Sequence, residues 1–61
     1  MRTWLKEIRT NMHKSQADVA NKVGISQQCY FFYESGERRP SVEVAKKIGE
    51  YLNFDWTRFY T

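Results

Sequence analysis

The sequence of residues 16–35 is QADVANKVGISQQCYFFYES, and this stretch decides the fold. Ala20 provides a small side chain at a point where two helices can approach closely, and Gly24 tolerates the positive φ that a tight turn requires. Apolar residues fall where two helices joined by such a turn share a core: Val19, Val23, Ile25, Tyr30 and Tyr33. The stretch therefore predicts two helices connected by a turn of about three or four residues.

Turn signals divide the rest of the chain in the same way. They fall at residues 12–15, 23–26, 35–40 and 53–55. In the first segment, Leu5, Ile8 and Met12 recur at the spacing that forms one apolar stripe on a helix. The fourth segment repeats this spacing with Val42, Ala45, Ile48, Gly49 and Leu52. No segment alternates as a strand does, so we expect an all-α fold of five short helices in a single domain over residues 1–61.

Residues suited to helix ends stand at the same places. Side chains that can cap a helix N-terminus precede the second to fifth segments: Ser15, Ser26, Ser41 and Asp55. Asp18, three residues after Ser15, makes this start resemble a capping box. Asn53 suits the left-handed residue that ends a helix. The caps and the apolar periodicity therefore agree on where the helices begin and end.

The composition excludes several classes of protein. Cys29 is the single cysteine and His13 the single histidine, so the chain forms no internal disulfide and cannot build a four-ligand zinc site alone without carboxylates. No apolar run approaches the ~20 residues of a membrane span, and no signal peptide is recognisable. No carboxylate pair, nucleophile–base set or phosphate-binding glycine loop appears. We therefore expect a small soluble protein that is not an enzyme and has no metal, cofactor or membrane partner.

The charge permits a nucleic-acid partner without requiring one. Ten Lys and Arg against seven Asp and Glu give a net charge of +3.

The run SQADVANKVGIS, residues 15–26, resembles the DNA-binding domains of phage Cro and repressor proteins and of small bacterial regulators of the xenobiotic-response-element type. Residues 34–41, ESGERRPS, are similar to the loop of that family, and Phe54-Asp55-Trp56 to its closing helix. The resemblance covers essentially the whole chain. It implies a lambda-repressor-like domain in which the second and third helices form a helix-turn-helix and the third enters the major groove of DNA, usually as a two-fold dimer.

The candidate base-contacting residues lie on the third helix, between the breaks at 23–26 and 35–40. If this helix enters the groove with its N-terminus first, Gln27 and Gln28 are the first side chains to reach base edges. A glutamine amide can pair with both N6 and N7 of adenine. Phe32 lies one turn beyond Gln28, and the resemblance implies that this position also contacts bases.

The candidate phosphate-contacting residues lie on either side of that helix. Gln16, at the start of the second helix, resembles the glutamine with which the family contacts phosphate. Arg38 and Arg39 follow the third helix and are placed to contact the opposite stretch of backbone. The resemblance further implies an ion pair between Arg9 and Glu34. It also makes His13 a turn residue, because family members often carry a positive-φ glycine there.

The aromatic run at residues 30–33 is the least usual feature of the third helix. At 100° per residue Tyr30 and Tyr33 share the buried face, which leaves Phe31 and Phe32 exposed. One interpretation is that Phe32 packs against thymine methyl groups and favours an A·T-rich half-site. The other is that the two phenylalanines dock on a protein or weaken DNA binding by crowding the groove. The role of Phe31 stays open.

Other side chains of possible interest are given structural roles. Cys29 lies near a helix N-terminus, and for this side chain a packing role is favoured over a redox switch. The closing segment carries more aromatic surface than a chain of this length covers. We expect part of it to cover the core near Trp4, and the rest, with Tyr51, to form a dimer interface.

The sequence as a whole predicts a transcriptional regulator that binds double-stranded DNA in a sequence-specific manner. We expect a homodimer on an inverted-repeat operator with half-sites one helical turn apart, in the bacterial cytoplasm at the nucleoid, without a small-molecule effector. The alternative is a protein-interaction module of the antitoxin or anti-repressor type, which keeps this fold but no longer recognises specific DNA.

Overall fold

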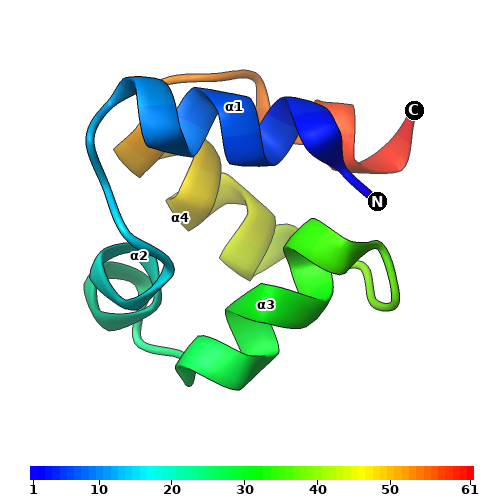
Figure 1. The fold of residues 1–61 in the computed structure, drawn as a ribbon. Helices are drawn as coiled ribbons and strands as arrows, with labels where there is room; N and C mark the ends of the chain where they lie inside the picture. Colours follow the sequence, from blue (N-terminus) through cyan, green and yellow to red (C-terminus); the bar gives the residue numbers. More distant parts are fainter.

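A computed structural model describes residues 1–61 and contains only helices (Figure 1). Four α-helices follow one another along the chain: α1 (Thr3–Asn11), α2 (Gln16–Val23), α3 (Gln27–Ser35) and α4 (Val42–Leu52). The last element, η1 (Trp56–Tyr60), is a 3₁₀-helix. The all-α prediction is therefore confirmed, with one difference, because the fifth helix is a short 3₁₀ turn and not an α-helix.

Side-chain caps begin four of these five elements, at the residues that the sequence indicates. Ser15 Oγ accepts a hydrogen bond from Asp18 N at 3.0 Å, and Asp18 Oδ2 accepts one from Ser15 N at 2.9 Å, which completes the capping box of α2. Equivalent caps begin the three later elements, at Ser26, Ser41 and Asp55. Each cap of this kind typically stabilises a helix by about 1 kcal/mol.

The turn between α2 and α3 depends on a glycine. Gly24 has φ = 80° and its N–H donates to Ala20 O at 2.9 Å, so α2 ends within a single left-handed residue. Ser26 already caps α3 two residues later. The two other expected left-handed residues are confirmed as well, with φ = 61° at Asn53 and φ = 58° at His13.

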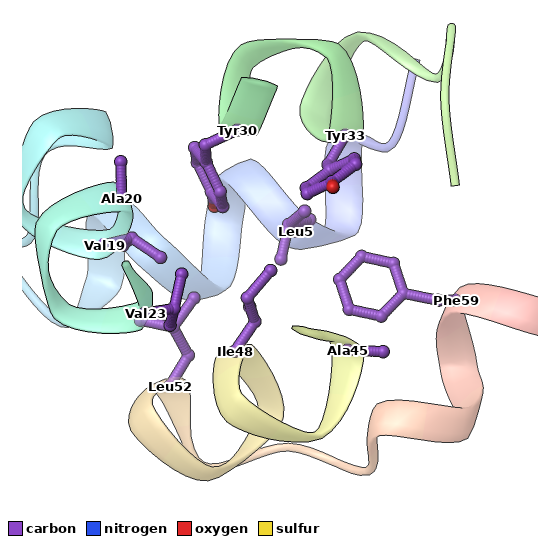
Figure 2. Packing of buried hydrophobic residues seen from close by; sticks show 10 residues of the cluster. All are labelled: Leu5, Val19, Ala20, Val23, Tyr30, Tyr33, Ala45, Ile48, Leu52 and Phe59. Atoms are coloured by element: carbon purple, nitrogen blue, oxygen red, sulfur yellow. The ribbon is translucent and has the colours of Figure 1, made fainter. Parts of the chain in front are cut away.

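The core lies where all five elements meet: α2 packs against both α3 and α4, α1 contacts α3, and the closing segment packs on α4 (Figure 1). Figure 2 shows the side chains of ten buried residues pointing toward one another from every element: Leu5, Val19, Ala20, Val23, Tyr30, Tyr33, Ala45, Ile48, Leu52 and Phe59. The predicted burial of Tyr30 and Tyr33 is confirmed. Because α2 and α3 share this core with α4, their relative orientation is fixed by packing as well as by the turn.

The closing segment returns across α4 to α1. A Cβ atom at Gly49 would lie 2.8 Å from Phe54 O and 3.0 Å from Trp56 Cβ, so only a glycine allows the backbone to pass this close. Beyond it Phe59 packs edge-on to Trp4, with 5.4 Å between ring centroids. The expectation that this segment covers the core beside Trp4 is thus confirmed. None of the helices combines the length and the apolar character needed to cross a membrane.

Candidate nucleic-acid interface

The outer face of α3 presents the candidate base-contacting side chains. Gln27 and Gln28 occupy its first two positions, directly after the Ser26 cap, and both are exposed. Phe31 and Phe32 follow one turn later, each four residues after one of the glutamines, so each shares a face with it. The structure therefore gathers the three predicted base contacts, Gln27, Gln28 and Phe32, on one short helix.

The two phenylalanines differ in exposure, which the sequence did not indicate. Phe31 is 46% exposed, as expected. Phe32, by contrast, is half-buried. The Arg38 guanidinium covers it at 5.1 Å from its ring centroid, and the Phe31 ring is centred 5.8 Å away. The prediction that both rings are exposed is therefore confirmed for Phe31 and corrected for Phe32. Phe31 is the open ring, and Phe32 is partly covered.

Both candidate arginines lie on the segment that connects α3 to α4. Arg38 and Arg39 are exposed, and each rests against an aromatic ring. Arg39 lies 5.2 Å above the ring centroid of Tyr60, as Arg38 does above Phe32. Cation–π contacts of this kind are typically worth about 0.5–1 kcal/mol at exposed sites. They hold the Arg38 guanidinium against α3 and the Arg39 guanidinium against the end of η1.

The acidic residue of α3 is buried and paired. Glu34 is 2% exposed, and its carboxylate accepts hydrogen bonds from Arg9 Nε at 2.6 Å and Arg9 Nη2 at 3.2 Å. The Arg9–Glu34 ion pair implied by the resemblance is thereby confirmed. Burial alone would raise the pKa of the Glu34 carboxyl, but the hydrogen bonds from Arg9 and Gln16 outweigh burial and lower its pKa. The exposed face of α3 consequently carries no negative charge.

Gln16 belongs to the same buried network. It is the first residue of α2 and half-buried, and its Nε2 donates to Glu34 Oε1 at 3.1 Å. Arg9 extends the network through Nη1, which donates to Lys14 O at 2.8 Å in the α1–α2 connection. The network therefore joins α1, α2 and α3, and it holds Gln16, at the start of α2, against Glu34 of α3.

Arg2 is a positioning residue that the sequence analysis missed. Its backbone N donates to Glu34 O at 2.7 Å, and its Nη1 donates to Tyr33 O at 2.7 Å and to Arg38 O at 2.8 Å. One side chain thus fixes both the C-terminal end of α3 and the segment that carries the two arginines. No sequence pattern signals these contacts, because the acceptors are backbone carbonyls more than thirty residues away, at separations of 31 and 36.

The remaining features of the surface lie elsewhere. The one pocket, of about 440 Å³, is lined by Lys22, Val23, Lys47, Glu50 and Tyr51 and contains none of the predicted site residues. Cys29 is half-buried, and its Sγ lies 3.2 Å from Tyr33 Oη, which is consistent with the expected packing role. No three side chains of the types that bind metals are grouped together.

Comparisons with known proteins agree with this geometry. The family model described as helix-turn-helix matches residues 5–59. The chain is 48% identical over 60 residues to the uncharacterized HTH-type transcriptional regulator YqaF of Bacillus subtilis, a match that covers 98% of the chain and 79% of that protein. It is 36% identical over 53 residues to an uncharacterized HTH-type transcriptional regulator of Archaeoglobus fulgidus, covering 87% of the chain and 75% of that protein.

A phage protein is also among the relatives. The cryptic phage CTXphi transcriptional repressor RstR of Vibrio cholerae is 28% identical over 47 residues, which cover 77% of the chain and 42% of the repressor. No solved structure is significantly similar to the chain. The resemblance to Cro and phage repressors is therefore confirmed, and the chain belongs to the helix-turn-helix family of transcriptional regulators.

Proposed function

We propose that this protein is a sequence-specific regulator of transcription that binds double-stranded DNA with α3 in the major groove. The observation that carries the proposal is the chemistry of the exposed face of α3. That face presents two amides and no acid, since Glu34 is buried against Arg9, and two exposed arginines follow in the connection to α4, after Gly36 and the exposed Glu37. A helix of this kind suits base edges flanked by phosphates.

In this proposal Gln27 and Gln28 contact base edges. Both amides are exposed at the N-terminal end of α3 and make none of the hydrogen bonds found within the protein, so their donors and acceptors are free for DNA. A bidentate contact from a glutamine to adenine N6 and N7 discriminates against other bases by about 1–3 kcal/mol.

Phosphate contacts are assigned to Arg38, Arg39 and Gln16. Support for the two arginines comes from their exposure and from the contacts of Arg2 and the aromatic rings, which order the segment. Gln16 uses one N–H toward Glu34, which leaves the other N–H of the amide for a phosphate oxygen. Contacts of this type set affinity and register without distinguishing sequences.

Phe32 is assigned a contact with a thymine methyl group. Its ring is half-buried beneath Arg38, so only part of the ring is available to DNA. Because the Arg38 guanidinium lies over the Phe32 ring, the proposed thymine contact of Phe32 lies next to the proposed phosphate contact of Arg38.

We further propose that the protein acts as a homodimer on an inverted repeat, with its recognition helices about 34 Å apart. Tyr51 and the closing aromatic segment are the candidate interface. Repression would follow from occupancy of the operator in the bacterial cytoplasm, at the nucleoid and without a small-molecule effector. That a relative is named a transcriptional repressor supports this mode of action.

The test compares two variants on the duplex that the protein selects from a random library and on random DNA. Gln28→Ala is expected to lose about 1–3 kcal/mol of binding on the selected duplex and little on random DNA. Arg39→Ala is expected to weaken binding to both and to reduce the salt dependence by about one phosphate contact. Equal losses of Gln28→Ala on both duplexes would contradict the assigned role.

A second candidate function rests on the exposed Phe31 ring. In a protein-interaction module of the antitoxin or anti-repressor type, this ring and Phe32 would dock on a partner protein. The double variant Phe31→Ser, Phe32→Gln distinguishes the two functions. Abolished partner binding would favour the module, whereas an altered DNA preference with partner binding intact would favour the regulator.

A further inference from the structure

We propose that Phe31 is a specificity-determining residue of α3 and that it contacts the C5 methyl group of a thymine in the major groove. This inference rests on the proposed DNA-binding function. It concerns a residue whose role the sequence left open, and it defines the chemical group that is recognised, the methyl group of a 5-methylpyrimidine.

The position of Phe31 follows from the packing of α3. Tyr30, Tyr33 and Glu34 are the buried residues of this helix, and at 100° per residue Phe31 points away from the centre of that face. It lies four residues after Gln27, on the same side of the helix. The Phe31 ring, which is 46% exposed, therefore lies one helical turn after the Gln27 amide that is proposed to contact a base edge.

The Phe31 ring packs against a neighbouring ring that is itself held in place. The Phe32 ring is centred 5.8 Å away at an interplanar angle of 60°, and Phe32 is itself held beneath the Arg38 guanidinium at 5.1 Å. Arg38 O in turn accepts a hydrogen bond from Arg2 at 2.8 Å. Because its neighbour is held in this way, Phe31 loses less side-chain freedom when it contacts a ligand than an isolated exposed ring would.

The chemistry of the groove identifies the partner of this ring. Base edges in the major groove present hydrogen-bond donors and acceptors, and the one apolar group among them is the C5 methyl of thymine. A phenyl ring that replaces water at any other edge would leave a donor or acceptor unpaired. The apolar match is therefore a thymine, and not any other base.

A protein partner fits the surface less well. A standard protein interface buries about 800 Å² on each partner around an apolar centre. Phe31 is the one large exposed apolar residue of α3, and the other large exposed apolar residues lie on other segments: Met1, Met12 and Val42. Gln27 lies on the same side of the helix, and the Phe32 ring next to Phe31 carries the Arg38 guanidinium, so the polar groups around Phe31 suit a nucleic acid.

The experiment replaces thymine by uracil, one position at a time, in the duplex selected from a random library. Uracil keeps Watson–Crick pairing and lacks only the methyl group. Because Phe32 is also assigned a thymine methyl group, binding by the wild-type protein is expected to weaken roughly fourfold at each of two positions per half-site, the value for burial of one methyl group. Phe31→Ala, with Phe31→Gln as a second variant, is expected to lose the effect of uracil at one of these positions and to keep it at the other.

Met12→Ala provides the matched control, since Met12 is also an exposed apolar residue but lies at the end of α1. This variant is expected to keep the full preference for thymine. Circular dichroism confirms that each variant is folded, and the exposure of Phe31 leads us to expect folding in both of its variants.

The outcomes separate the inference from the function on which it rests. If the protein selects a duplex and uracil has no effect at any position, or if the Phe31 variants keep the uracil effect at every position where the wild-type protein shows it, the assignment of Phe31 is wrong while DNA recognition stands. If no duplex is selected by the folded protein, both the proposed function and this inference are overturned.

Discussion

At the scale of single residues, Glu34 connects three helices through hydrogen bonds to one buried carboxylate. Glu34 lies on α3 and its carboxylate is buried, and Arg9 of α1 and Gln16 of α2 donate hydrogen bonds to it. Because these hydrogen bonds lower the pKa of Glu34, their contribution to stability is full above its ordinary pKa of about 4.3 and is lost as the pH falls through the lower folded value. The same carboxylate keeps negative charge off the face of α3 proposed to meet DNA.

Breaking this pair from one side should cost more than removing both partners. Arg9→Met leaves the Glu34 carboxylate buried with Gln16 as its remaining donor, and the free energy of unfolding is expected to fall by about 3–5 kcal/mol. The double variant Arg9→Met, Glu34→Met is expected to recover much of that loss, because no buried charge remains. Urea denaturation measures both values. A double variant less stable than Arg9→Met would contradict this explanation.

At the scale of elements, two glycines determine how the helices join. Gly24 ends α2 at φ = 80° and has no atom within 4 Å of an added Cβ, so the demand there is purely conformational. Gly49 has an ordinary helical backbone, but Phe54 O and Trp56 Cβ approach within 3.0 Å of its missing Cβ. One glycine is needed for a turn and the other for a close contact.

Alanine at these two positions should therefore act differently. Gly24→Ala is expected to cost about 1 kcal/mol of stability through backbone strain alone, without moving the aromatic side chains. Gly49→Ala is expected to cost about 1–3 kcal/mol and to displace the closing segment, which changes the NMR shifts of Trp4 and Phe59. Glu50→Ala, on the exposed side of α4, serves as a control within about 0.5 kcal/mol of wild type. Unchanged Trp4 and Phe59 shifts in Gly49→Ala would be inconsistent with the close contact.

The difference between local conformation, as at Gly24, and contact between distant segments, as at Gly49, also explains how far the sequence could predict this structure. Signals that act within four residues, such as the Ser15–Asp18 box and the left-handed Gly24 and Asn53, predicted the helix boundaries correctly. Contacts between distant residues left no local pattern. The sequence therefore did not reveal the hydrogen bonds from Arg2 to the end of α3, or the cover that Arg38 gives to Phe32. The Arg9–Glu34 pair was foreseen only through the resemblance to a known family.

At the scale of the whole molecule, two buried tyrosines make the free energy of unfolding depend on pH in the alkaline range. Burial raises the pKa of Tyr33 to about 12 and also raises the pKa of Tyr30, whose hydroxyl is buried without a hydrogen-bond partner. Both phenols stay neutral in the folded protein at a pH at which they ionise in the unfolded chain. Their contribution to stability is therefore full below about pH 10, the ordinary pKa of tyrosine, and is lost as the pH rises above it.

Alkaline unfolding should show this directly. Between about pH 10 and pH 12 the free energy of unfolding is expected to fall, by at most about 1.4 kcal/mol per pH unit for each tyrosine. Tyr33→Phe removes one of the two phenols and should reduce the slope. Thermal melts of both proteins across this range provide the measurement, and an identical slope in the variant would show that Tyr33 does not titrate in this way.

The central claim is that α3 recognises a DNA sequence, and selection from a random duplex library tests it most directly. The measurement is made at about physiological salt, where non-specific phosphate binding is weak. The account predicts enrichment of an inverted repeat that contains A·T pairs and has half-sites about one helical turn apart. A folded protein that enriches no sequence would contradict it, and would favour the protein-interaction function, with Phe31 and Phe32 as the first residues to substitute.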